Sequence, residues 1–590
     1  MRHLFILVVL AICLAVPSMS LSYRDHSLWT KTTKAAADHV IDFRVALRQR
    51  NIDVLEAVLL DVSTPTSPNY GKHWSIERIM ELIAPPHYVS DEIVQFLELH
   101  GAYNVENKGD FLKASARVED IEKLFKVEMF NYKHNTRKNM HIVRSSKLYT
   151  IPAKYADEIQ LVSGISELPH TKNRPSGRKL AVGSSDPGIV IPQTIQGLYG
   201  IPVGYQNNAN TSLCLAEFQA DQSFNKKDLK TFSTQTATPL INVEKIVGQY
   251  QPDQPDLEST LDVQYGGAVA ETAQIWFWTV EGWMYEFSSD LSTTYPAPYV
   301  VSMSWGWPEN LQCQSGVGNC ASGETSEDYV GRVNAEFIKI GVRGITLLAA
   351  SGDQGAPGDG DSDCTDKKHP LSTIFPGASP YVTSVGATML AAPSTVDKKH
   401  AKKSVGANPP ICSQSPGCAT STKEAVCTYP DALITTGGGF SDYSPVPSWQ
   451  ATQVAAYLKS GVVLPPSTVF NASNRGFPDV SALGHNYVII ASGQSEVVDG
   501  TSCSSPVWGA IVALLNSYRF NNNKPALGFL NPLLYSAPAN CYTDITSGNN
   551  KCTEQCCDAN GYIATTGWDP VTGLGTPVFK NLLAYVQTLN

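Results

Sequence analysis

Residues 499–506 have the sequence Asp-Gly-Thr-Ser-Cys-Ser-Ser-Pro and run directly into small and apolar residues from Val507 to Leu515. This pattern predicts a tight turn that places Ser502 at the start of a buried helix. We expect the turn to expose the hydroxyl, while N–H groups at the helix end stabilise negative charge that develops beside it. The stretch therefore predicts a nucleophilic serine, and a nucleophilic serine needs a base.

A histidine base, as in a Ser-His-Asp triad, is disfavoured by the sequence. Only His369, His400 and His485 follow the expected processing region, and they precede Pro, Ala and Asn. None of the three lies in a glycine-rich turn between a strand and a helix, where a subtilisin-like enzyme carries its base. Carboxylates are the other candidates for the base.

Glu258 and Asp262 are four residues apart, which places both carboxylates on one face of a helix. Like charges at that spacing repel, and the repulsion raises the proton affinity of one partner, as acid–base chemistry requires. The same spacing also fits a solvated acidic face of a surface helix, so the pair alone leaves both interpretations open.

Asp353 is a third candidate acid. The apolar residues 347–350 run directly into Ser351-Gly352-Asp353, which predicts a buried strand that ends in a loop. Sheets of α/β proteins place site residues at such strand ends. Taken alone, Asp353 also fits an ordinary turn residue.

These pieces together resemble the sedolisin, or serine-carboxyl peptidase, family. The resemblance covers nearly the whole chain after residue 20, and its specificity lies in the joint order of the motifs. The matching segments are Glu258-x-x-x-Asp262, Ser302-Met303-Ser304-Trp305-Gly306, Ser351-Gly352-Asp353, residues 435–441 (Thr-Thr-Gly-Gly-Gly-Phe-Ser), residues 475–480 (Arg-Gly-Phe-Pro-Asp-Val), Gly500-Thr501-Ser502 and residues 567–573 (Gly-Trp-Asp-Pro-Val-Thr-Gly).

The resemblance implies a role for each catalytic candidate. Ser502 would attack the scissile carbonyl, Glu258 would take its proton and return it to the leaving amine, and Asp262 would orient Glu258. Asp353 would donate a hydrogen bond to the oxyanion, which requires a protonated carboxyl group. A carboxylate base stays ionised where a histidine would be protonated, so we expect an activity optimum near pH ~4–5.

Two positions depart from the family pattern. Cys503 stands where alanine is usual, and we expect it to act as a small packing residue. Asp499 stands where a small residue is common, and its charge is expected to shift the pH profile or the substrate preference.

The overall layout is closest to the aminopeptidases of this family that release tripeptides, so peptides and unfolded proteins are the expected substrates. An acid endopeptidase is the alternative within the class, because the sequence does not show whether the cleft closes beyond the third substrate residue. A catalytically silent binding protein with the same fold is an alternative from another class. The presence of all four catalytic candidates disfavours it.

The front of the chain is expected to carry targeting and inhibitory segments. Arg2 and His3 lead into an apolar run from Leu4 to Val16, which predicts a signal peptide at residues 1–20. No later stretch has the roughly 18 uninterrupted apolar residues of a membrane span. The product is therefore expected on the secretory route, in the lysosome or outside the cell.

Residues 21–167 are predicted to form an α+β prodomain. Amphipathic helical patterns at residues 76–82 and 91–99 accompany strand-like pieces such as residues 56–60. Residues 66–72 are rich in turn formers, which predicts a surface loop, and they resemble the prodomain signature of the family. The prodomain is expected to act as an intramolecular inhibitor.

Residues 168–187 are predicted to be the linker that carries the processing site, because Pro, Gly and basic residues make a segment extended, exposed and cleavable. Residues 21–180 contain 23 Lys+Arg and 20 Asp+Glu, whereas residues 181–590 contain 20 and 34. A basic prodomain on an acidic enzyme would be released on acidification, followed by self-cleavage. Ordinary drift in charge explains the difference equally well. The acidic balance argues against a nucleic-acid partner.

Residues 188–590 are predicted to form the peptidase domain. Buried-strand patterns at residues 299–303 and 344–348 alternate with helical stretches such as residues 329–340. This alternation favours an α/β fold with a mostly parallel sheet flanked by helices, and the resemblance implies a subtilisin-like version of it.

Twelve of the 13 cysteines follow residue 180, which predicts several disulfides in a secreted chain. Cys313 and Cys320 could close a small loop. Three cysteines cluster in residues 412–427 and four in residues 541–557, and one of the latter is a candidate partner for Cys364. Glycosylation sequons begin at Asn210 and Asn471.

A calcium site is implied near the C-terminus. From the resemblance, its ligands would be the side chains of Asp544 and Asp569 and the carbonyl groups of Ile545, Thr565 and Gly567. Carboxylate and carbonyl oxygens suit this hard cation. From spacing alone, two turn aspartates explain the pattern as well.

Overall fold

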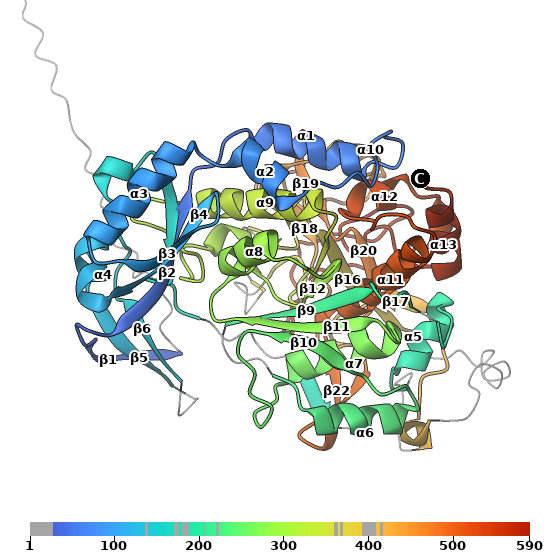
Figure 1. Cartoon of the computed structure of the whole chain (residues 1–590). Coiled ribbons are helices and arrows are strands. Elements are labelled where there is room, and N and C mark those ends of the chain that lie inside the picture. The colour runs from blue at the N-terminus through green and yellow to red at the C-terminus, as the bar shows by residue number, and fades with distance from the viewer. Residues whose placement is uncertain are drawn as a thin grey trace, which may run out of the picture.

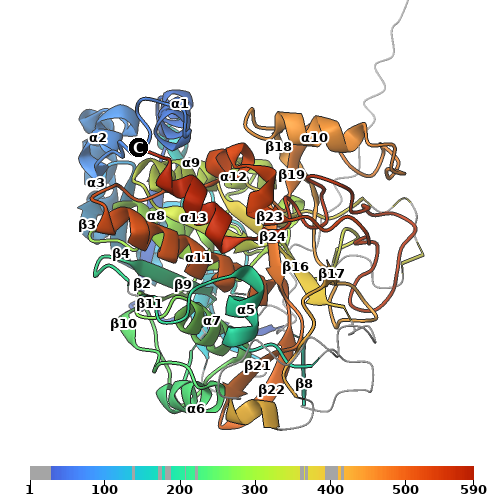
Figure 2. The same ribbon diagram turned by 90° about the vertical axis from the view of Figure 1, so that its right-hand side faces the viewer.

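The computed structural model describes residues 28–135, 140–169, 188–205, 207–219, 223–358, 364–365, 368, 370–391, 409–413 and 417–590, with the backbone alone at residues 176–179. The expected signal peptide, most of the predicted linker, His369 and His400 lie outside the described residues. Figures 1 and 2 show two packed parts, an N-terminal one and a larger C-terminal one.

The N-terminal part has the expected α+β architecture. Its strands form two antiparallel sheets, ordered β3 (Tyr103–Asn107), β4 (Phe111–Arg117), β2 (Val40–Leu47), β7 (Ile159–Ser163), and β1 (Trp29–Lys34), β5 (Met129–His134), β6 (His141–Ser145). Helices α3 (His87–Leu99) and α4 (Val118–Phe125) share a hydrophobic core with β2 and β4. Helices α1 (Ile52–Ser63) and α2 (Ile76–Ile83) instead pack against α9 (Ser326–Val342) of the C-terminal part (Figure 1).

The prediction of a strand at residues 56–60 is wrong, because these residues lie inside α1. Leu55, Leu59 and Val62 recur at helical spacing and are buried, and Leu55 and Leu59 belong to a core shared with α9. A short, mostly apolar run is compatible with the two-residue repeat of a strand and with the 3.6-residue repeat of a helix. Only a longer pattern of buried residues distinguishes the two. The helices predicted at residues 76–82 and 91–99 are confirmed as α2 and α3.

The C-terminal part is built on an eight-stranded sheet. Its order is β10 (Val243–Val247), β11 (Gln274–Val280), β9 (Ser212–Phe218), β12 (Val300–Met303), β14 (Thr346–Ala350), β16 (Thr383–Leu390) and β17 (Glu424–Val426), with β20 (Val480–Leu483) also paired to β16. Every pairing is parallel except that of β16 with β17.

Helices cover both faces of this sheet. Helices α7 (Leu257–Val269) and α11 (Thr501–Asn521) belong to one hydrophobic core, whereas α8 (Met284–Thr293) and α9 belong to the other (Figure 1). The predicted α/β fold with a mostly parallel sheet flanked by helices is therefore confirmed. Of the helices in the described residues, none is long and apolar enough to cross a membrane.

An antiparallel hairpin, β21 (Tyr487–Ala491) and β22 (Gln494–Asp499), leads into α11. The linker segment β8 (Ser176–Lys179) adds a third strand along β22, with Ser176 opposite Asp499 (Figure 2). The described part of the linker is thus extended, as predicted. It lies beside the strand that precedes Ser502.

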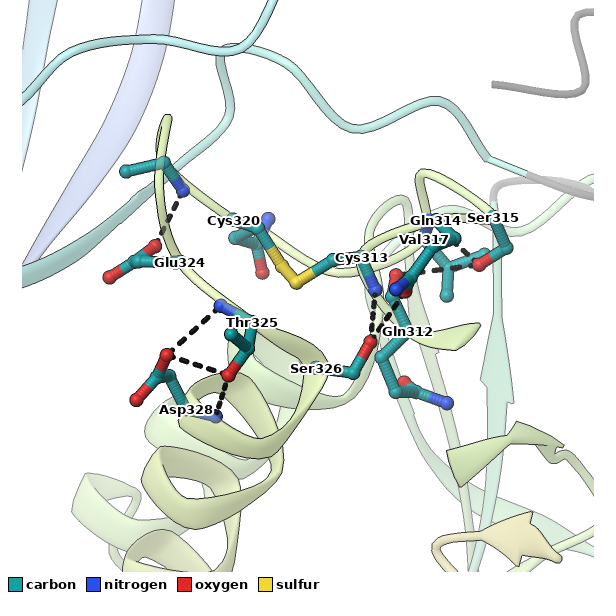
Figure 3. Close-up of a disulfide and its surroundings, with 12 residues drawn as sticks. Gln312, Cys313, Gln314, Ser315, Val317, Cys320, Glu324, Thr325, Ser326 and Asp328 are labelled. Atoms are coloured by element: carbon teal, nitrogen blue, oxygen red, sulfur yellow. Dashed lines mark hydrogen bonds between the residues drawn. A yellow bond between two sulfur atoms is a disulfide. The ribbon is translucent and has the colours of Figure 1, made fainter. Parts of the chain in front are cut away.

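The predicted Cys313–Cys320 disulfide is present and closes a small loop before α9 (Figure 3). The N-terminal part binds this loop, since the Tyr149 hydroxyl donates to the Asn319 carbonyl at 2.8 Å and the Leu168 N–H donates to the Gly316 carbonyl at 3.2 Å. The start of the predicted linker at Leu168 is buried rather than exposed, because it packs against Trp29, Tyr132 and Ile142 of the N-terminal part.

Three further disulfides join Cys364 to Cys556, Cys412 to Cys418 and Cys552 to Cys557. The expected link from the C-terminal cluster to Cys364 is thereby confirmed. Cys503 is a buried free thiol, as its expected packing role requires.

Candidate active site

Ser502 lies at the junction of β22 and α11. The strand ends at Asp499, Gly500 continues in an extended conformation, and the helix begins at Thr501. This is the predicted presentation of the serine at a helix start. The expected exposure of the hydroxyl is wrong for this form of the chain, because Ser502 is fully buried and its Oγ donates to the Ser304 carbonyl at 3.3 Å.

Helix α7 carries both predicted carboxylates in its first two turns. Asp256 caps the helix and accepts a hydrogen bond from the Ser259 N–H. Glu258 and Asp262 follow one turn apart, and their exposed fractions are 4% and 0%. These values exclude the alternative of a solvated acidic face, because a surface helix would leave the carboxylates in water.

Ser304, which directly follows β12, connects Ser502 to Asp262. Its Oγ lies 2.7 and 2.9 Å from the two Asp262 carboxylate oxygens and 3.5 Å from the Ser502 carbonyl oxygen. Pro506 has no N–H with which to occupy the Ser502 carbonyl one turn back in the helix, so that oxygen stays accessible to Ser304. Ser502 and Asp262 are thus both hydrogen-bonded to Ser304.

Asp353 lies in the loop that follows β14, as predicted. Its Oδ1 accepts hydrogen bonds from the backbone N–H and the hydroxyl of Thr501, at 2.8 and 2.7 Å. A Cβ placed on Gly500 would lie 3.5 Å from both Asp353 Oδ2 and Ser502 Cβ. The second carboxyl oxygen and the serine side chain therefore flank the same face of Gly500.

Sequence reasoning missed a further acid, Glu217 of β9, which accepts a hydrogen bond from the Trp305 indole at 2.8 Å. Burial raises the pKa of Glu217 well above its usual value, and the neighbouring carboxyls of Asp262, Asp256 and Glu258 raise it further. A signal was present, because Glu217 is the one charged residue in a strand of otherwise apolar and small side chains.

His485 is buried near the nucleophile but bonds elsewhere. Its Nδ1 lies 2.8 Å from Asp499 Oδ2. Among the hydrogen bonds of the described residues, none joins the His485 ring to the Ser502 hydroxyl. The carboxylates therefore remain the better candidates for the base.

The predicted calcium ligands also come together. The Gly567 N–H donates to Asp544 Oδ2 and the Thr565 N–H donates to Asp569 Oδ2, both at 2.8 Å. Burial raises the pKa of Asp569 to about 7, and the nearby carboxyl of Asp544 adds to the rise. Asp544 Oδ1 is buried, with no hydrogen-bond partner in the described part of the chain. Two carboxylates that repel each other and an oxygen without a donor fit a cation.

No cluster of three or more His, Cys, Asp and Glu side chains that could hold a metal occurs among the described residues. A cation at Asp544 and Asp569 would therefore need backbone carbonyl oxygens as further ligands, as the predicted set supplies.

Comparison with known proteins agrees with this geometry. The pro-kumamolisin activation domain matches residues 27–168. Physarolisin from Physarum polycephalum is 54% identical over 573 residues, which cover 97% of this chain and 98% of the relative. The chain belongs to the sedolisin family of serine-carboxyl peptidases. It is accordingly a serine-type peptidase made with an N-terminal activation domain.

The chain is also similar to a second relative and to a solved structure. Tripeptidyl-peptidase 1 from Mus musculus is 31% identical over 579 residues, covering 94% of this chain and 93% of the relative. The solved structure of a Pseudomonas sedolisin matches with a TM-score of 0.50 at 24% identity, over 69% of this chain and 99% of that one. The latter match supports the fold of the catalytic part.

Proposed function

We propose that this sedolisin hydrolyses peptide bonds at acid pH with Ser502 as nucleophile and Glu258 as general base. The observation that carries the proposal is the convergence of Ser502 and Asp262 on Ser304. Two residues separated by 240 positions meet there, in a buried cluster of acids that includes Glu258.

Each residue has one role in the proposed reaction. Ser502 Oγ attacks the scissile carbonyl carbon while Glu258 takes its proton, and that proton passes to the leaving amine to give an acyl-enzyme. Water then attacks the ester by the reverse route. Asp262 orients Glu258, and Asp353 Oδ2 stabilises the oxyanion as a neutral donor. Mass spectrometry of the acyl-enzyme on wild-type protein and on Ser502→Ala tests the nucleophile.

The specificity we propose is removal of tripeptides from free N-termini, supported by the similarity to tripeptidyl-peptidase 1 over most of both chains. The test compares a peptide with a free N-terminus and the same peptide N-acetylated. We expect tripeptide products from the first and little cleavage of the second. Equal cleavage of both would favour the endopeptidase, and no cleavage of either would favour a silent binding protein.

We further propose that residues 21–167 are an inhibitory prodomain that acid releases, with self-cleavage in residues 168–187. His73 supports this, because its Nε2 donates to the Ala526 carbonyl at 3.0 Å while its Nδ1 is buried without a hydrogen-bond partner. Burial lowers the pKa of His73, and the charge of Arg519 lowers it further. A group with a depressed docked pKa favours docking above its usual pKa and opposes it as the pH falls.

Precursor carrying Ser502→Ala tests self-cleavage. We expect it to stay unprocessed at acid pH, whereas wild-type precursor matures. Normal processing of the variant would show that another protease cuts the linker.

A calcium ion is proposed at Asp544 and Asp569, with carbonyl ligands from Ile545, Thr565 and Gly567. The ion would neutralise two carboxylates that otherwise repel each other, and so stabilise the C-terminal loops. We expect calcium at 100 times its Kd to raise the free energy of unfolding by about 2.7 kcal/mol, and Asp569→Ala to abolish the rise. An equal rise in both proteins would contradict this site.

We propose the secretory pathway, ending in the lysosome or outside the cell, as the route of this protein. Asn210 and Asn471 are exposed, as glycan acceptors must be. Loss of a mass shift on glycosidase treatment after Asn→Gln substitution at each position tests their use.

A further inference from the structure

The turn that carries Ser502 is held by a buried aspartate that no catalytic role uses. Asp499 has no exposed surface and accepts three hydrogen bonds. Its Oδ2 accepts from the Leu433 N–H at 2.8 Å and lies 2.8 Å from His485 Nδ1, and its Oδ1 accepts from the Asn486 N–H at 2.8 Å.

These three donors come from two separate loops. His485 and Asn486 belong to the turn between β20 and β21, and the neighbouring Gly484 carbonyl accepts the Gly500 N–H at 2.9 Å. Asp499 and Gly500 are therefore fixed together against one turn. Ser502 lies only two residues further on.

Leu433 belongs to the second loop, which also supports Asp353. In that loop the Thr435 N–H donates to the Asp353 carbonyl at 2.9 Å, and the Gly437 N–H donates to the Gly352 carbonyl at 2.7 Å. Asp499 thus links the segment that supports the proposed oxyanion donor to the segment that presents the nucleophile.

We propose that Asp499 and His485 are positioning residues that keep Ser502 in register with Asp353 at acid pH, with His485 holding Asp499 in its ionised form. The proposal rests on the proposed function of Ser502 and Asp353. Ionisation matters because both oxygens of an Asp499 carboxylate accept strongly, whereas protonation would place an O–H group beside three donors.

Electrostatics support this assignment. Burial by itself would raise the pKa of Asp499, but the hydrogen bond and charge of His485 and the N–H groups of Asn486 and Leu433 outweigh it and lower the pKa. The other titratable groups that interact with Asp499 include the thiols of Cys427 and Cys503, whose pKa values burial raises well above the usual range. Both thiols are therefore neutral at acid pH. Asp353 is a further acidic group near the same two thiols.

The test measures kcat, KM and the pH profile of mature enzyme carrying Asp499→Asn or His485→Asn. Asparagine at 499 has a single acceptor oxygen, so it cannot accept from Leu433 and His485 on one side and from Asn486 on the other. We therefore expect kcat to fall by up to about 100-fold with little change in KM, as misplacement of reacting groups does. Asparagine at 485 keeps a neutral donor, so we expect near-normal kcat at the optimum. The acid limb of its profile should move to higher pH, because Asp499 then protonates sooner.

Asp228 provides a matched control at the other end of the same hairpin. This buried aspartate of α6 (Lys226–Thr236) accepts from the N–H groups of Ser492 and Gly493 at the β21–β22 turn. Asp228→Asn should lower the thermal stability without moving the acid limb. An unmoved acid limb in His485→Asn, or equal profiles for Asp499→Asn and Asp228→Asn after allowance for stability, would overturn the proposal.

Failure of the proposed function would look different. Full activity of Ser502→Ala would show that Ser502 is not the nucleophile, whatever the pH profiles of the variants at positions 485 and 499. If Asp499→Asn does not fold, the acid limb of the His485→Asn pH profile tests the proposal by itself, because it is measured on folded protein.

Discussion

Two buried clusters of charge in the described part of the chain contrast in the groups that set their pKa values. At the interface between the N-terminal and catalytic parts, Asp110 lies 2.6 Å from Lys339 Nζ and 3.3 Å from Arg332, and all three side chains are fully buried. Burial would raise the pKa of Asp110, but Lys339 and Arg332 outweigh it and the pKa is lowered. At the active site, the carboxyls around Glu217 raise its pKa instead.

The comparison teaches what each cluster can do. Paired charges stay ionised, so the interface cluster holds two surfaces together over a wide pH range. Carboxyls that face other carboxyls share protons near the working pH, which is the condition for general acid–base chemistry. Substitutions that remove a charge from one cluster, or from the interface around it, should therefore have different effects.

The largest effect is expected from Glu258→Gln, which keeps the shape of the side chain and removes the base. We expect kcat/KM to fall by about 10²- to 10⁴-fold. Thermal stability should hold or rise, since a like charge leaves the cluster. Activity within twofold of wild type would assign the base to another group.

Asp110→Ala should have the next largest effect, on the stability of the precursor. The substitution leaves Glu336 as the one carboxylate between the buried cations Arg332 and Lys339 in the described residues, so one buried positive charge is uncompensated. Breaking a buried ion pair in this way costs about 3–5 kcal/mol. Denaturant unfolding of inactive precursor measures the loss. Mature enzyme serves as the control, because we propose that processing removes the segment that contains Asp110. An unchanged free energy of unfolding of the precursor would show that this ion pair does not stabilise it.

Glu217→Gln should change the pH dependence of stability. A carboxyl whose folded pKa is raised stabilises the fold fully below its unfolded pKa, and this contribution is lost as the pH rises through the folded value. The variant should therefore lose less stability than wild type between pH 4 and pH 8 in thermal melts. Parallel curves for the two proteins would contradict the raised pKa.

The smallest effect is expected from Asp290→Asn at the partly exposed edge of the same interface. Arg44 and Lys113 of the prodomain pair with Asp290 at 2.7 and 2.6 Å. Such pairs near solvent contribute about 0.2–1 kcal/mol and weaken with salt. Precursor unfolding at low and high salt measures the loss, and a cost as large as that of Asp110→Ala would remove the distinction between buried and exposed pairs.

Local pattern was enough to predict much of the fold. The strands at residues 299–303 and 344–348 are runs of apolar residues bounded by turns, and the structure places β12 and β14 there. The run at residues 56–60 is equally short and mostly apolar, but it lies in a helix, because Leu55 and Val62 outside the run continue the helical spacing of buried residues.

The site was predictable only as a set of separate motifs. Short spacings made Ser502, Glu258, Asp262 and Asp353 candidates, and the resemblance to the sedolisin family implied their roles. Glu217 and the link through Ser304 depend instead on contacts between distant strands. His485 and Asp499 are only 14 residues apart, yet their pairing follows from the β21–β22 hairpin rather than from a recognisable motif.

The most direct test of the account is kcat/KM of the mature enzyme from pH 2.5 to pH 8, measured together with mass spectrometry of the acylated serine. The account predicts a maximum near pH ~4–5, loss of activity towards neutrality and an acyl group on Ser502. A maximum above pH 7, or acylation at a residue other than Ser502, would contradict it.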